Sequence, residues 1–212
     1  MALFNSPFFK KLKGHFDRWV FYESRGQQRI RRQIEKKPLP PTNLQILQRH
    51  RMRSAIAFYR ANTDKQLRWI WKKKAAGMVM SGYNLFIGSN IAAFDRNCRI
   101  VDYSLLHIST GSLELPPYFR LQSCTESEVI LNWQKGVPEN SDRNKDQLMA
   151  AYLTNDGCFS LKWLPLTGVY RKDGQAILNI PEWTKGEIHL YCFFANRKQE
   201  KYSPEKYFQL RR

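Results

Sequence analysis

The spacing of apolar residues changes along the chain, from a period near 3.6 to a period near 2 at about residue 100. These are the periods of an α-helix and of a β-strand with one buried face. The sequence therefore predicts an α+β protein. A hairpin-plus-helices module is expected over 1–98, a linker containing Ser109-Thr-Gly-Ser112 over 99–112, and a β-sandwich over 113–212.

Two elements are expected in residues 1–34, before the proline cluster. Apolar residues about four apart, with lysines between them, predict a short amphipathic helix over 1–16, built on Phe4, Phe8, Phe9, Leu12 and Phe16. It would dock on the body of the protein or lie on an anionic membrane. Residues 17–34 predict a β-hairpin, because Trp19–Tyr22 is a β-rich run, Arg25-Gly26 supplies a turn and Gln28–Ile34 alternates.

A helix is expected from Asn43 to about Ala61, after a cluster of prolines. Thr42 would be its N-cap, and Gln45 would complete the capping box. An apolar stripe should face the core, while Arg49, Arg53 and Arg60 project from a different face. The members of the stripe are Leu44, Leu47, Met52, Ala55, Ile56 and Tyr59.

Two further helices are expected before residue 95. The second should begin at the capping box Thr63–Gln66 and end at Gly77 or Gly82. Its exposed face would carry Lys65, Arg68 and Lys72, and its inward residues would be Leu67, Ile70, Trp71 and Met78. The third should run from Tyr83 to Phe94, with Leu85, Phe86 and Ile91 buried.

Seven short strand candidates follow, separated by polar turns, and predict an immunoglobulin- or fibronectin-like sandwich. Trp133 is expected in its core, and Tyr191 is either a tyrosine corner or an ordinary core aromatic. The last long strand is apolar on both faces, so one face should meet the basic module or another subunit. The candidates are 118–124, 129–133, 149–153, 158–163, 176–180, 188–194 and 207–210.

Several of these segments resemble an uncharacterised family of short proteins, found mainly in Bacteroidota, that open with a glycine-punctuated hairpin. Gly14 and Gly26 match the hairpin glycines, and Arg32 matches an arginine after the second strand. Pro40, Thr42 and the spacing of Gln45 and Arg49 lie close to the family's P-x-T-x-x-Q-x-x-x-R helix. Val101–Ser104 and Ser109–Leu113 resemble its linker, and Ser81–Ile87 resembles a segment of phage-encoded relatives. The resemblance implies a fibronectin-like C-terminal half and no established activity; this chain is more basic in its first third.

The charge of the chain is concentrated near its N-terminus. Residues 1–75 contain 19 of the 35 Lys and Arg and only four acids, a net charge of +15, whereas the remaining 137 residues carry +2. Such a split predicts a basic binding module whose partner is a polyanion: nucleic acid first, an acidic protein or virion-assembly partner second, and an anionic membrane last.

No motif for catalysis or for a cofactor accompanies this charge. The four histidines are scattered, and no phosphate-binding glycine loop or nucleophile elbow is present. Cys98, Cys124, Cys158 and Cys192 form no C-x-x-C pair and are expected as buried free thiols in a reducing compartment. No secretory signal or membrane span is expected. We therefore expect a cytoplasmic or virion protein that is neither an enzyme nor a cofactor protein.

The leading functional hypothesis is that the basic module contacts nucleic-acid phosphates, while the sandwich makes protein contacts. Arginines on the hairpin and the first helix would straddle a duplex, and Trp19, Tyr22 and Trp69 would stack on bases if exposed. The alternative is a structural or assembly component of a virion or multiprotein complex, which would bind an acidic protein partner and form a homo-oligomer or a larger assembly. The candidate contact residues are Arg29, Arg31, Arg32, Arg49, Arg53, Arg60, Lys65, Arg68, Lys72, Trp19 and Tyr22.

Overall fold

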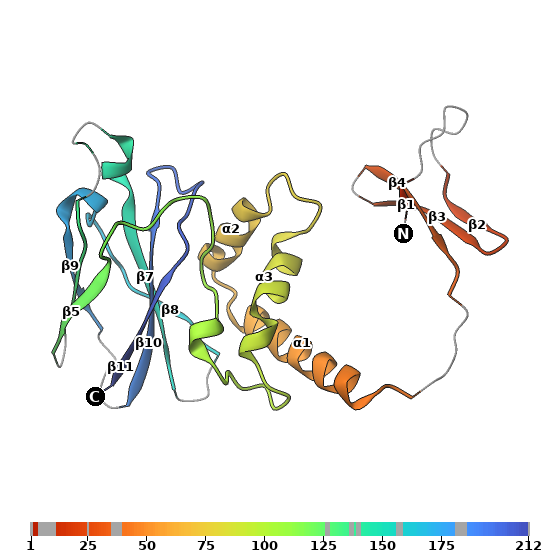
Figure 1. Ribbon diagram of the computed structural model, residues 1–212, viewed down its shortest axis with the longest axis horizontal. Coiled ribbons are helices and arrows are strands. Elements are labelled where there is room, and N and C mark those ends of the chain that lie inside the picture. Colours follow the sequence, from red (N-terminus) through yellow and green to blue (C-terminus); the bar gives the residue numbers. More distant parts are fainter. Residues whose placement is uncertain are drawn as a thin grey trace. The chain divides into compact units, whose positions relative to one another are not determined.

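A computed structural model of the chain separates it into two compact units, Met1–Thr42 and Asn43–Arg212. We call them the N-terminal unit and the larger unit (Figure 1). This boundary at Thr42 differs from the linker expected over 99–112. The structure describes residues 2–3, 12–24, 26–34, 40–125, 128–135, 138, 141–155, 159–180 and 186–211.

The N-terminal unit is a four-stranded antiparallel sheet of order β1-β4-β3-β2. Its strands are β1 (Ala2–Leu3), β2 (Gly14–Phe16), β3 (Trp19–Ser24) and β4 (Gln27–Arg32). The predicted hairpin is confirmed as β3 and β4, and Gly26 has the positive φ of +73° that its turn requires.

The helix expected over 1–16 is wrong where the structure describes it. Ala2–Leu3 and Gly14–Phe16 are strands, and residues 4–11 lie outside the described part. Asp17, with φ of +49°, turns the chain so that Phe16 pairs with Trp19. The hydrogen-bonded pairing with β3 thus overrides the four-residue spacing of the phenylalanines.

The larger unit begins with α1 (Asn43–Ala61), α2 (Lys65–Lys74) and α3 (Gly82–Asn90), which confirms the three expected helices. The α2 cap is Asp64 rather than Thr63, because the Asp64 carboxylate accepts a hydrogen bond from the Gln66 amide at 3.0 Å. That helix ends at Lys74, before either glycine. Short 3₁₀ turns follow at η1 (Ile91–Ala93) and η2 (Tyr103–Leu105).

The helices bury most, but not all, of the residues expected inside. Ala55, Leu67, Ile70, Trp71 and Phe86 are buried in a core cluster. Leu44, Met52 and Met78, by contrast, are 78%, 47% and 45% exposed. None of residues 43–53 of α1 is buried, and Met78 lies in the loop after α2, so these three side chains lie outside the core cluster.

Two antiparallel sheets complete the larger unit. One has the order β5-β6-β9 and the other β11-β10-β7-β8. All seven strand candidates contain a strand. The bounds are β5 (Arg120–Cys124), β6 (Glu128–Asn132), β7 (Gln147–Thr154), β8 (Lys162–Trp163), β9 (Gln175–Asn179), β10 (Glu187–Ala195) and β11 (Lys206–Arg211), with 3₁₀ turns η3 (Asp142–Lys145) and η4 (Arg171–Asp173).

Within the larger unit, the sheet β11-β10-β7-β8 lies between the helices and the sheet β5-β6-β9 (Figure 1). On β10, Tyr191 and Phe193 belong to the cluster shared with the helices, whereas Leu190 and Phe194 belong to the cluster between the sheets. The prediction that one face of this strand meets the helical module is therefore confirmed. This shared core cluster also explains why the larger unit includes both helices and sheets.

Burial and hydrogen bonds decide the predictions made for Trp133, Tyr191 and the cysteines. Trp133 is a core residue, 5% exposed, and its indole N–H donates to the Arg171 carbonyl at 2.7 Å. The Tyr191 hydroxyl donates to the carbonyl of Tyr103, 88 residues away, so Tyr191 is a core aromatic rather than a tyrosine corner. Cys192 is buried as expected. Cys98 and Cys124 are exposed, because they lie in a loop and at a strand end, and Cys158 lies outside the described residues.

Candidate nucleic-acid interface

The two faces of the N-terminal sheet carry different chemistry. Directly opposed residues of antiparallel strands share a face, and successive residues alternate between faces. The register pairs Phe16 with Trp19 and Trp19 with Arg32, so these three side chains form one row across β2, β3 and β4. The next row on the same face contains Phe21 and Ile30. We call this the aromatic face.

The opposite face carries two of the arginines. His15, Val20 and Arg31 form one row there, and Tyr22 and Arg29 form the next. We call this the arginine face. The five hairpin residues expected to act together are thus divided: Trp19 and Arg32 lie on one side of the sheet, whereas Tyr22, Arg29 and Arg31 lie on the other.

Exposure also distinguishes these residues. Phe16 is 74% exposed and Trp19 is 44% exposed, and both Arg31 and Arg32 are exposed. Tyr22 and Arg29 are half-buried, and the Arg29 guanidinium donates to the Gln27 side-chain oxygen at 3.2 Å. Trp19 therefore meets the condition for stacking that the sequence left open.

The larger unit brings the other candidate residues onto two helix faces. Arg49, Arg53 and Arg60 recur at intervals of four and seven and share one exposed face of α1. Lys65, Arg68 and Lys72 recur at three and four on the exposed face of α2. We call these six residues the basic stripes.

An aromatic contact links the α2 stripe to α1. The Arg68 guanidinium of α2 lies 5.6 Å from the ring centroid of Tyr59, which directly precedes Arg60 in α1. Burial raises the pKa of the Tyr59 hydroxyl, although the charge of Arg68 opposes the shift. Arg68 is therefore positioned beside α1, against the apolar stripe to which Tyr59 belongs.

Trp69 extends the α2 stripe with a second aromatic ring. The ammonium groups of Lys73 and Lys72 lie 4.6 and 5.7 Å from its ring centroid. Its indole N–H donates to the Gln199 carbonyl at 2.9 Å, which anchors a side chain that remains 40% exposed. Trp69 thus also meets the stacking condition, although with two cations close to its ring.

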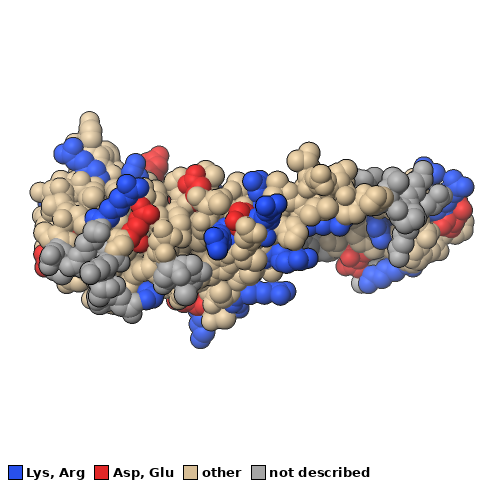
Figure 2. All heavy atoms as spheres, turned by 90° about the horizontal axis from the view of Figure 1, so that it is seen from below, with Lys and Arg blue, Asp and Glu red and all other residues tan. Residues whose placement is uncertain are grey.

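Few acids neutralise this surface. Residues 43–74 contain nine Lys and Arg and one acid, Asp64, whose carboxylate caps α2. Lys73 pairs with Glu200 at 3.2 Å, but within the described residues none of the six stripe residues forms an ion pair. Figure 2 shows Lys and Arg side chains extending into solvent over the region of the helices. The stripes consequently present unneutralised positive charge.

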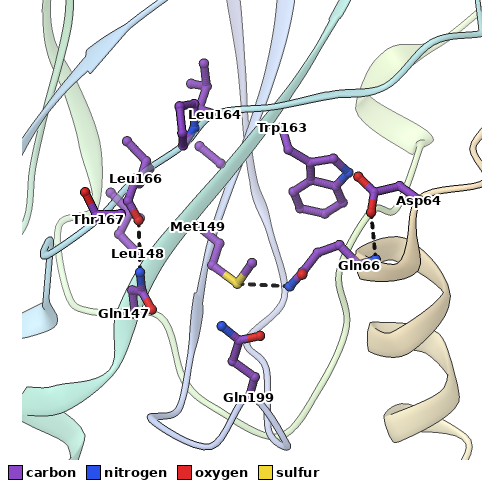
Figure 3. A pocket seen from close by; sticks show the side chains of 12 residues that line it. Asp64, Gln66, Gln147, Leu148, Met149, Trp163, Leu164, Leu166, Thr167 and Gln199 are labelled. Carbon is purple, nitrogen blue, oxygen red and sulfur yellow. Dashed lines mark hydrogen bonds between the residues drawn. The ribbon is translucent and has the colours of Figure 1, made fainter.

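A cavity of about 260 Å³ lies near the start of α2, beside the β7–β8 edge (Figure 3). Its polar groups are largely engaged: Gln66 donates to the Met149 sulfur at 3.6 Å, and Gln147 donates to the Leu166 carbonyl at 2.9 Å. The Trp163 indole nitrogen, which is turned toward Asp64, lacks a hydrogen-bond partner in the described part of the chain. With Asp64 as its one charged lining residue, this cavity is unsuited to phosphate.

Phe16 is the contact candidate that sequence reasoning missed. It was expected on a helix, yet it lies beside Trp19 on the aromatic face. The signal available was the turn-forming Asp17-Arg18 between Gly14–Phe16 and the β-rich Trp19–Tyr22. Among the described residues, no group of three or more His, Cys, Asp or Glu could hold a metal ion, and no helix is long and apolar enough to cross a membrane.

Comparison with models of protein families gives no match to the chain, and comparison with curated proteins gives none either.

Proposed function

We propose that the protein binds nucleic acid, mainly through its phosphates, and that the basic stripes are the principal contact. The observation that carries this proposal is the unneutralised charge of α1 and α2, where exposed Arg and Lys residues share one face of each helix. Cations placed on a phosphate backbone release condensed counterions, which provides affinity without sequence recognition. Arginine adds bidentate contacts with phosphate oxygens.

The experiment is a salt titration of binding to DNA and RNA by the nuclease-treated protein. Six phosphate contacts predict that log K falls with log salt concentration with a slope of about −4 on a single strand and about −5 on a duplex. Failure to bind either nucleic acid at low salt, or tight binding that ignores salt, would reject the proposal.

We also propose that β5–β11 form a fibronectin-like sandwich that makes protein contacts. The order β5-β6-β9 against β8-β7-β10-β11 corresponds to strands A-B-E and C′-C-F-G of such domains, and supports this assignment. The buried Trp133 immediately after β6 is also consistent with it. Because many functions share this fold, the sandwich itself adds no argument for a particular partner.

A structural or assembly role is the second candidate function, and one observation favours it. None of residues 12–24, 26–34 and 40–42 of the N-terminal unit is buried, whereas a small sheet normally needs a covered apolar face for stability. An acidic protein partner or a second copy would supply such a cover. Sizing the protein before and after nuclease treatment separates the two functions: partners lost with the nuclease support nucleic-acid binding, and a persistent complex supports assembly.

A further inference from the structure

We propose that the aromatic face of the N-terminal sheet binds single-stranded nucleic acid by stacking bases on Phe16 and Trp19. This inference rests on the proposed function and specifies its substrate class. It starts from the row in which Phe16, Trp19 and Arg32 occupy directly opposed positions on three neighbouring strands. Opposed Cβ atoms are about 4.5–5.5 Å apart, so the two aromatic side chains and the arginine leave the sheet from neighbouring positions on one face.

Both rings are accessible to a ligand. Phe16 and Trp19 are 74% and 44% exposed. These fractions are high, because aromatic side chains usually bury most of their large apolar surface. In the next row, Gly14 lies opposite Phe21 and contributes no side chain, and an added Cβ there would meet nothing within 4 Å. The aromatic face therefore stays open beside the two rings.

An unpaired base is the ligand that suits such a surface. A base within a duplex is stacked on its neighbours and hides both ring faces, whereas a single strand can offer each base to an aromatic side chain. Arg32, in the same row, is placed to meet the phosphate that links successive bases. The row thus combines the stacking and charge contacts that single-strand binding uses.

Charge favours this occupant over an apolar protein surface or a second copy. The N-terminal unit contains ten Lys and Arg and three acids, a net charge of +7. Two such units repel each other, while a polyanion is attracted. Glu23, two residues beyond Phe21, places one carboxylate on the aromatic face. The Lys13 ammonium lies 3.8 Å from this carboxylate and offsets its charge.

The test compares the full-length wild type with Phe16→Leu/Trp19→Leu, which keeps apolar bulk but removes both rings. Probes are an oligothymidylate of roughly 16 nucleotides, the upper end of common single-strand site sizes, and a duplex of equal length. Trp19→Phe keeps a ring and checks that the sheet tolerates substitution. Tyr118→Leu, in the larger unit, removes an aromatic side chain that is also 74% exposed and serves as the matched control.

The double variant should bind the single strand at least about tenfold more weakly, since each stacked base contributes a factor of roughly 5 to 150. Its duplex affinity should change less than about twofold, and Trp19→Phe and Tyr118→Leu should resemble the wild type. Equal losses on both probes, unchanged single-strand binding, or an altered oligomeric state would overturn the inference. If the wild type binds neither probe, the proposed function is rejected as well. If the double variant binds the single strand as tightly as the wild type, only the stacking inference is rejected.

Discussion

Asp146 and Arg171 form an ion pair within the larger unit, with a carboxylate oxygen 3.4 Å from the guanidinium Nε and side chains only 4% and 3% exposed. Burial raises the pKa of Asp146 more than Arg171 lowers it, and burial likewise lowers the pKa of Arg171. The Arg171 amide donates to the Asp146 carbonyl at 2.8 Å, and its guanidinium donates to the Glu114 carbonyl. The pair therefore links η3 to η4 at an electrostatic cost.

Removing one partner of this pair should destabilise the protein strongly. Asp146→Ala leaves the Arg171 guanidinium buried without its carboxylate, and the expected loss is about 3–5 kcal/mol in the free energy of unfolding. Urea denaturation measures it. Asp146→Leu/Arg171→Met, which removes both charges, should lose clearly less than the sum of the single variants. Equal stability of Asp146→Ala and wild type would contradict this account of the pair.

Two glycines of the larger unit should respond oppositely to alanine. At Gly111, an added Cβ would overlap the carbonyl group of Tyr202, so Gly111→Ala should lower the midpoint of thermal unfolding. Gly88 lies within α3, where an added Cβ meets nothing within 4 Å. Gly88→Ala should therefore raise stability by about 0.5–1 kcal/mol. A stabilising Gly111→Ala would show that the close approach of these two backbone segments is incorrect.

The contact between His107 and Glu205 predicts a pH dependence of stability. Their Nδ1 and Oε1 atoms are 2.7 Å apart, and this hydrogen bond raises the pKa of His107. The protonated imidazole thus stabilises the folded state fully below the unfolded pKa of about 6.5, and the effect is lost as pH rises through the higher folded pKa. The stability difference between wild type and His107→Gln should shrink as pH rises from 6 to about 8.

The buried His189 does not affect this comparison. Burial lowers the pKa of His189, so its contribution to stability is present above about pH 6.5 and is lost as pH falls through its folded pKa. Wild type and His107→Gln both contain His189, so its slope cancels from the difference between their stabilities. A stability difference for His107→Gln that stays constant across this range would contradict the role assigned to Glu205.

Local signals in the sequence were sufficient for most of the elements but not for their packing. Periodicity and caps predicted α1 over Asn43–Ala61 and a strand within each of the seven candidates. They left open whether the basic module or another subunit covers one face of β10, because a stripe of apolar residues identifies a buried face but not the element that covers it. For the same reason Leu44 was expected inside and is exposed.

The candidate contact residues show the same division. The helical spacing of Arg49, Arg53 and Arg60 correctly predicted a shared exposed face. In the hairpin, by contrast, the expected single group of contact residues is divided, because successive residues of β4 such as Arg31 and Arg32 lie on opposite faces. The row containing Phe16 depends on the register between β2 and β3. The sequence did not predict this register, because the four-residue spacing of the phenylalanines indicated a helix.

The salt dependence of binding by Arg49→Ala/Arg53→Ala tests the central claim, the role of the basic stripes, most directly. Its control is Arg120→Ala/Lys206→Ala, which removes the same charge from exposed positions on β5 and β11. The Arg49/Arg53 variant should bind nucleic acid more weakly at low salt, and the slope of log K against log salt should be shallower by about 1.4–2. The control should keep the wild-type slope. Equal slopes for both variants would contradict a specific role for the stripes and leave only the net charge of the protein.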